Sequence, residues 1–276
     1  MRKNNFLPSK LFDIDNKNII LTGSAGLLGS HYADFLSSNG ANMILIDINE
    51  KQNTKLEKSI LSKYNTNAHA YTCDLTSIQE IKSLKKSILK DFKTIDVLIN
   101  NAAYTTKSSI TTTSKKISFE KFPFEMWQNS LSVNLTSVFL FCQEFGEIML
   151  KQKEGIIVNI SSIYGLVGAD QRIYDQTSFN LPVSYAATKG SIINLTKYLA
   201  AYWQKKNIRV NTLSLGGVKD TNYQKSNFIK KYSEKTMLGR MANKTDFDGA
   251  LLFLISNASS YVTGTNLIVD GGWTAW

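Results

Sequence analysis

Short apolar runs rich in β-branched residues alternate along the whole chain with longer segments of helical period. Seven runs have the length and composition of strands: 18–22, 42–47, 68–73, 96–100, 155–160, 209–214 and 266–269. Helices are expected between them at 26–38, 49–64, 78–92, 125–151, 183–205 and 245–256. Strands that are apolar on both faces and separated by helices are typical of a parallel sheet covered on both sides. The sequence therefore predicts an α/β fold with a doubly wound, seven-stranded parallel sheet.

A single domain is expected over 1–276, because no repeat, low-complexity linker or Pro/Gly-rich break divides the chain. Two polar stretches, 104–123 and 163–184, interrupt the alternation after expected strands. In an open α/β sheet, ligands bind beyond the carboxyl ends of the strands. These stretches are therefore expected to be substrate-side loops, while 1–17 is expected to be an N-terminal extension.

Composition excludes several classes of protein. The net charge is +10, but the lysines are spread over helical segments and mixed with acidic residues, which is typical of solvated helix faces. A polyanionic partner is the alternative, yet no nucleic-acid-binding pattern is present. The longest apolar stretches, such as 250–255, fall far short of the ~20 residues of a membrane helix, and no apolar segment of a secretory signal follows the basic start. With Cys73 and Cys142 expected as reduced thiols, the sequence favours a cytoplasmic protein without a metal site.

The first expected strand runs into a glycine-rich turn, Thr22-Gly-Ser-Ala-Gly-Leu-Leu-Gly29, and a helix follows. Glycines at such a turn let the backbone approach a pyrophosphate, which would lie at the helix N-terminus. Asp47 ends the second strand, where a carboxylate can accept hydrogen bonds from ribose hydroxyls and would repel a 2′-phosphate. NAD(H) is therefore expected in preference to NADP(H). Alternatively, Asp47 caps the next helix, as Asp74 could after the third strand.

A second group of polar residues has the composition of an acid–base site. Tyr185 and Lys189 are four residues apart in a helical segment, so they share one helix face. An adjacent ammonium lowers the pKa of a phenol. Ser162 follows an apolar strand, and Asn134 lies in a long helical segment. Such a set can polarise a carbonyl and deliver a proton while a nicotinamide delivers hydride.

Together these motifs make the chain resemble a single-domain short-chain dehydrogenase/reductase, a family with a Rossmann-type fold. The resemblance also covers Asn100-Asn-Ala-Ala103, the stretch 209–217 and the stretch 261–272. It implies that Tyr185 is the acid–base, that Lys189 lowers its pKa and binds the nicotinamide ribose, and that Ser162 hydrogen-bonds the reacting oxygen. Asn134 would hold a proton-relay water. The implied cofactor-binding residues are Thr22, Gly23, Ser24, Gly26, Leu27, Leu28, Gly29, Asp47, Asp74, Leu75, Asn101, Ala102, Ala103, Tyr185, Lys189, Gly216 and Val218.

The resemblance further implies a substrate-lid region at 216–243 and a homotetramer or homodimer. The chain departs from the family at three points. Its glycines are spaced Gly-x-x-Gly-x-x-Gly, which is typical of the longer, sugar-nucleotide-modifying branch, and Leu215 replaces the usual proline. The segment between Ser162 and Tyr185 is longer than usual. That segment resembles dehydrogenases of bacterial surface-sugar pathways, including flagellin modification and nonulosonate synthesis.

The expected function is NAD-dependent interconversion of a secondary alcohol and a ketone on a polar, anionic sugar or sugar derivative. Candidate substrate contacts are Tyr104, Tyr164 and Arg172, in or beside the two loops. One alternative is a nucleotide-sugar epimerase or dehydratase with tightly bound NAD, which the glycine spacing suggests; such enzymes carry a further substrate domain that the last strand leaves no room for. The other is a non-catalytic NAD-binding protein, against which the intact set of four catalytic residues argues.

Overall fold

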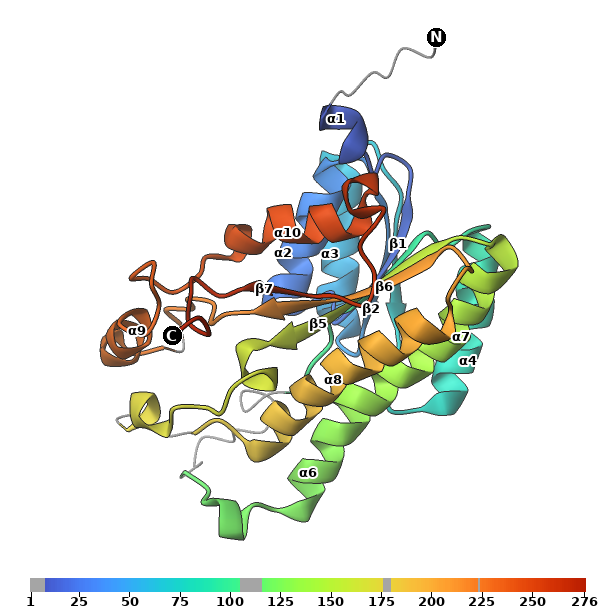
Figure 1. The fold of residues 1–276 in the computed structure, drawn as a ribbon. Helices are drawn as coiled ribbons and strands as arrows, with labels where there is room; N and C mark the ends of the chain where they lie inside the picture. Colours follow the sequence, from blue (N-terminus) through green and yellow to red (C-terminus); the bar gives the residue numbers. More distant parts are fainter. Residues whose placement is uncertain (1–7, 105–115, 176–179, 223) are drawn as a thin grey trace.

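The computed structural model describes residues 8–104, 116–175, 180–222 and 224–276. Their strands form one sheet in the order β3-β2-β1-β4-β5-β6-β7, and every neighbouring pair is parallel (Figure 1). The predicted fold class is confirmed. The strands are β1 Asn18–Thr22, β2 Asn42–Asp47, β3 Ala68–Thr72, β4 Val97–Asn100, β5 Gly155–Ser162, β6 Ile208–Leu215 and β7 Asn266–Val269.

Helices cover both faces of the sheet because the strands are apolar on both sides. One apolar cluster joins the sheet to α2 (Leu27–Ser38), α3 (Glu50–Lys63) and α10 (Asp248–Ile255). A second cluster joins the opposite face to α4 (Ile78–Asp91), α7 (Ser137–Gln152) and α8 (Val183–Tyr202). The strand order reverses between β1 and β4, and such a switch point creates a crevice at the carboxyl edge of the sheet.

The helix expected at 125–151 is divided in the structure. It consists of α6 (Phe124–Leu131), a π-helical turn (Ser132–Thr136) and α7. The π-helical turn contains the predicted catalytic residue Asn134. Short π-helical turns often occur at functional sites, and hydrophobic periodicity does not reveal them.

Smaller elements surround the carboxyl edge of the sheet. They include α9 (Ser226–Ser233), which the sequence did not predict, and 3₁₀ turns at Phe119–Lys121, Ile163–Gly165, Gln171–Tyr174 and Lys244–Phe247. Another 3₁₀ turn, Asn257–Ser259, precedes β7 at the amino edge. A third apolar cluster lies here and is mainly aromatic: Ile163, Tyr164, Ile173, Tyr174, Phe228, Tyr232, Met241 and Trp273. The N-terminal extension forms the short helix α1 (Pro8–Leu11). Among the described residues, no helix is long and apolar enough to span a membrane.

Candidate active site

The glycine-rich turn packs closely against the segment after β4, and two of its glycines leave no room for a side chain. Gly23 has a φ of +65°, and a Cβ there would lie 2.7 Å from the Cα of Ala102. A Cβ on Gly29 would overlap the carbonyl oxygen of Gly23. Gly26 is the N-cap of α2 and supplies no side-chain hydrogen bond to its first turn. The turn therefore leaves the space and the helix N–H groups that a pyrophosphate requires, so the residues fit a dinucleotide.

Asn101 and Thr22 hold this turn to the neighbouring strand. The Thr22 hydroxyl accepts hydrogen bonds from the backbone N–H groups of Asn101 and Ala102, at 3.0 and 3.1 Å. The Asn101 side chain donates back to the carbonyl oxygens of Thr22 and Gly23. Ala103 follows at the end of the strand and is half-buried. These residues thus join the ends of β1 and β4 at the switch point.

Asn53, a buried residue that the sequence analysis did not identify, supports the glycine-rich turn through a hydrogen bond. The Ser24 hydroxyl donates to the Oδ1 of Asn53 at 2.7 Å, and the Nδ2 of Asn53 donates to the carbonyl oxygens of Leu45 and Tyr71. Ser24 is fully buried, so its hydroxyl supports the turn and does not face the crevice. A polar residue at a buried position of α3 is the sequence signal that could have identified Asn53.

Two more turn residues predicted to bind cofactor differ in exposure. Leu27 opens α2 and is exposed, whereas Leu28 packs against the apolar cluster beneath. Only the first therefore presents its side chain to solvent beside the turn.

Asp47 contacts the glycine-rich turn directly. Its Oδ2 accepts a hydrogen bond from the backbone N–H of Ala25, and its Oδ1 accepts one from Asn49, both at 2.9 Å. Asn49, not Asp47, caps α3, so the capping alternative for Asp47 is wrong. Each carboxylate oxygen retains a lone pair that could accept a hydrogen bond from a ribose hydroxyl.

Asp74 also leaves the capping of its helix to another residue. Its Oδ1 accepts hydrogen bonds from the backbone N–H and the hydroxyl of Thr76, while Ser77 caps α4. Leu75 is buried in the core, so its side chain does not face solvent. Asp74 closes the loop after β3 at the same edge of the sheet as Asp47.

Ser162, Tyr185 and Lys189 come together at the ends of β5 and α8. The Lys189 Nζ donates to the carbonyl oxygen of Ile160 at 2.8 Å and lies 5.7 Å from the centre of the Tyr185 ring. The Ser161 hydroxyl donates to the Lys189 carbonyl at 2.7 Å, which fixes α8 against β5. The longer segment between Ser162 and Tyr185 therefore does not separate the two side chains.

Burial dominates the proton affinities of this group. Burial raises the pKa of Tyr185, and a hydrogen bond with Ser162 opposes that rise. The expected lowering of the Tyr185 pKa by Lys189 is not seen, and the pKa is raised because burial outweighs the hydrogen bond with Ser162. Lys189 is 2% exposed, and burial lowers its pKa to about 8. At neutral pH the phenol is therefore protonated, and most of the lysine is charged.

Asn134 lies fully buried in the π-helical turn and holds Tyr104. Its Oδ1 accepts from the backbone N–H of Tyr104 at 2.6 Å, and its Nδ2 donates to the Tyr104 carbonyl and to the hydroxyl of Thr188. The side chain thus links the end of β4 to α8, beside Lys189. Tyr104 is the last described residue before 105–115, so most of the first predicted loop lies outside the described residues.

The second predicted loop contributes Tyr164 and Arg172. The Tyr164 hydroxyl lies 3.1 Å from that of Tyr174, and its backbone N–H donates to the Ser162 hydroxyl. The Arg172 guanidinium is 80% exposed and bonds both oxygens of Asp170. Residues 176–179 of this loop lie outside the described residues.

The loop after β6 also lies at the carboxyl edge of the sheet. Leu215 is the last residue of the strand and pairs with Ser162 and Val269. A Cβ on Gly216 would lie 2.8 Å from the Cα of Asp270, and Val218 forms an isolated bridge with Ala242. The predicted cofactor residues of this loop therefore lie beside the catalytic group.

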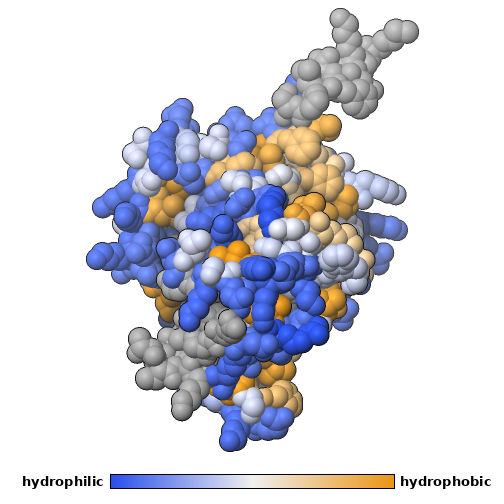
Figure 2. Space-filling model, turned by 90° about the vertical axis from the view of Figure 1, so that its left-hand side faces the viewer, coloured by the Kyte–Doolittle hydropathy of each residue, from blue (hydrophilic) through white to orange (hydrophobic). Residues whose placement is uncertain are grey.

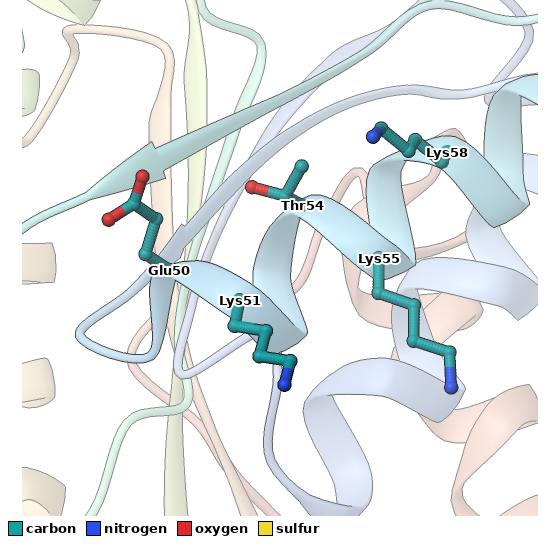
Figure 3. Close-up of a pocket in the computed structure, with 5 residues that line it drawn as sticks. All are labelled: Glu50, Lys51, Thr54, Lys55 and Lys58. Atoms are coloured by element: carbon teal, nitrogen blue, oxygen red, sulfur yellow. The ribbon is translucent and has the colours of Figure 1, made fainter.

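A hollow elsewhere on the surface is lined by α3 alone (Figure 3). Its residues are Glu50, Lys51, Thr54, Lys55 and Lys58. The lysine side chains are exposed and extend from different sides of the helix. We interpret this hollow as a solvated helix face, as the mixed charges in the sequence suggested.

Comparisons with known proteins agree with this geometry. A family model described as enoyl-(acyl carrier protein) reductase matches residues 23–274. The chain is 30% identical over 260 residues to post-translational flagellin modification protein A of Campylobacter coli, covering 94% of this chain and 99% of that protein. It is 32% identical over 266 residues to cyclopentanol dehydrogenase of a Comamonas species, covering 95% and 98%. A short-chain dehydrogenase from Leptospira borgpetersenii, solved with bound NAD⁺, is 35% identical with a TM-score of 0.80, covering 95% and 94%.

Proposed function

The chain belongs to the short-chain dehydrogenase/reductase family, and from this premise we propose that it interconverts a secondary alcohol and a ketone with NAD(H) on a polar, sugar-like substrate. The observation that carries the proposal is the meeting of Ser162, Tyr185 and Lys189 beside the glycine-rich turn. A hydroxyl, a phenol and an ammonium at the carboxyl edge of the sheet can act on one oxygen atom.

The roles of the side chains follow from their protonation. When bound, the nicotinamide supplies or accepts the hydride. In ketone reduction, the Tyr185 phenol donates its proton to the carbonyl oxygen, and the Ser162 hydroxyl donates a hydrogen bond to the same oxygen. Lys189 holds a positive charge near the phenol and stabilises the phenolate that remains. In alcohol oxidation the phenolate accepts the proton instead.

Asp47 supports NAD(H) over NADP(H). Its carboxylate is fixed by Ala25 and Asn49 at the end of β2. A ribose with both hydroxyls can donate to it, whereas a 2′-phosphate would meet a like charge. The first turn of α2, which begins at Leu27 after Gly26, would receive the pyrophosphate.

The proposal of a polar, anionic sugar rests on the charge around the third apolar cluster. Asp170 bonds Arg172, and its Oδ2 lies 2.7 Å from the Nζ of Lys235. Arg172 could therefore turn toward an anionic substrate without leaving Asp170 unpaired. The α9 side of the molecule is mainly hydrophilic, with apolar side chains in small patches (Figure 2). The name of the flagellin modification relative states no substrate, whereas that of the cyclopentanol dehydrogenase supports a cyclic alcohol.

We also propose that the chain folds as one domain and acts as a cytoplasmic homotetramer or homodimer. Aromatic side chains are exposed on the outer helices: Tyr198 and Tyr202 stack on α8, and Phe139 is exposed on α7. Apolar side chains of this size favour contact with a second surface.

The test is NADH appearance at 340 nm with polyols, sugar acids, sugar phosphates and cyclopentanol. Turnover of a polar, anionic sugar above all others supports the proposal. Tyr185→Phe should reduce turnover by roughly 10²–10⁴-fold, the usual contribution of a general acid–base, and leave NADH binding intact. Tyr261→Phe, at a fully exposed tyrosine outside the proposed subunit contact, is the matched control. Isomerisation of a sugar without net reduction would support the epimerase alternative, and full activity of Tyr185→Phe would refute the mechanism.

A further inference from the structure

Tyr232 of α9 is bound to the loop that follows β6. Its hydroxyl accepts a hydrogen bond from the backbone N–H of Gly217 at 2.6 Å. Its ring stacks on Trp273, with centroids 4.3 Å apart and planes inclined by 28°. The side chain is 2% exposed. Tyr232 therefore joins three separate segments: α9, the β6 loop and the C-terminal segment.

The backbone at Gly217 is shaped to receive this ring. A Cβ on Gly217 would lie 2.5–2.7 Å from the Cζ, Cε2 and hydroxyl oxygen of Tyr232. The Gly217 carbonyl accepts a hydrogen bond from Ala242 at 3.0 Å, and Gly216 donates to Val269 at 2.9 Å. The Gly217 N–H thus has a side-chain hydroxyl as its acceptor, whereas the Gly216 N–H donates to a backbone carbonyl.

The position of the loop in the sheet identifies which half of the cofactor it borders. Asp47, the proposed ribose ligand, ends β2 on one side of the switch point, whereas β5 and β6 lie on the other. Leu215, just before the loop, pairs with Ser162 in register. Since hydride transfer must occur beside Ser162 and Tyr185, the loop 216–218 borders the nicotinamide half.

We propose that Tyr232 is a positioning residue that holds the loop 216–218 in place for the nicotinamide half of the cofactor. The inference rests on the proposed NAD(H)-dependent function. Loss of the hydroxyl leaves the Gly217 N–H without its acceptor and frees the loop to move. The adenosine half binds at the opposite side of the switch point and does not depend on Tyr232.

Tyr232→Phe tests the inference because it removes only the hydroxyl. Affinities for NADH and for ADP-ribose, which lacks the nicotinamide, are measured by calorimetry on the full chain. We expect NADH affinity to fall about tenfold, the scale of one lost buried hydrogen bond, and ADP-ribose affinity to stay unchanged. Tyr261→Phe, at a fully exposed position, is the matched control and should change neither affinity.

A merely structural role would not separate the two ligands. Equal weakening of NADH and ADP-ribose, or no change in either, overturns the inference. Gly217→Ala provides a second variant, since its Cβ displaces the Tyr232 ring, and it should show the same selective loss. If the wild-type protein binds neither ligand, the proposed function itself fails, and the inference fails with it.

Discussion

The Nζ of Lys189 lies 5.7 Å from the centre of the Tyr185 ring. Its hydrogen bond goes instead to the carbonyl oxygen of Ile160, at 2.8 Å. The lysine is therefore anchored to β5, with its ammonium group near the phenol ring. Burial raises the pKa of Tyr185 and lowers that of Lys189 to about 8, so both groups carry protons at neutral pH. These are the protonation states that the proposed ketone reduction requires.

Oxidation and reduction should respond oppositely to pH. Oxidation requires the phenolate, whose fraction rises about tenfold per pH unit below the pKa of Tyr185, so kcat/KM for the alcohol should rise between pH 6 and 8. Reduction should decline above pH about 8, where Lys189 loses its proton. Rates at 340 nm and constant ionic strength check both trends. Lys189→Arg keeps the charge and should move the decline to higher pH; pH-independent rates would contradict the assigned roles.

Removing the negative charge of Asp47 should weaken the preference for NAD over NADP. Asp47→Asn keeps the size of the side chain and one acceptor but removes the repulsion of a 2′-phosphate. We expect the ratio of kcat/KM for NAD to that for NADP to fall about tenfold, or about 1.4 kcal/mol. Asp91→Asn, at the far end of α4, is the control and should leave the ratio unchanged. Equal use of both cofactors by the wild type would contradict the expectation.

Two glycine substitutions should have opposite effects on stability. Gly23→Ala places a side chain at a φ of +65° and against Ala102. The left-handed backbone alone costs about 1–2 kcal/mol, so the free energy of unfolding should fall by at least that amount and NAD binding should be lost. Gly249 lies in α10, and no atom lies within 4 Å of an added Cβ. Gly249→Ala should therefore raise the free energy of unfolding by about 0.5 kcal/mol. Denaturant unfolding measures both changes. An unchanged free energy of unfolding in Gly23→Ala would contradict the close packing of the turn against Ala102.

Removal of Arg172 should affect the substrate and not the cofactor. If Arg172 leaves Asp170 to bind an anionic substrate, Arg172→Ala should raise KM about tenfold and leave NAD affinity unchanged. Lys63→Ala removes a comparable exposed ion pair, with Asp34 at 2.8 Å, and serves as the control. An unchanged KM for the best substrate would show that Arg172 only pairs with Asp170.

The strands could be predicted to within two residues because a short apolar run rich in β-branched residues marks most of them. The β5 residues after Ile160 were missed because Ser161 and Ser162 end that apolar run, yet both are buried in the strand. The α9 helix was missed for a related reason. It is eight residues long and buries only Phe228 and Tyr232, which is too short a pattern to identify by periodicity.

The sequence predicts where the site residues lie in the fold better than it predicts which groups their side chains bind. The Asn134 amide binds the backbone of Tyr104, thirty residues away, and such a contact exists only after folding. The pKa of Tyr185 depends mainly on how deeply the side chain is buried. The spacing of residues in a motif does not reveal that depth. Motifs thus identified which residues gather at the sheet edge, and the structure determines how each is held.

The third apolar cluster packs apart from the strands of the sheet. Within the described part of the chain, none of its buried members belongs to a strand. Tyr174 enters it from the extended segment after β5, and Phe228 from α9, with their rings 5.4 Å apart. New residues can therefore be accommodated there while the sheet and the glycine-rich turn keep their own packing. A longer or different segment after β5 would thus alter this cluster and leave the packing of the glycine-rich turn intact.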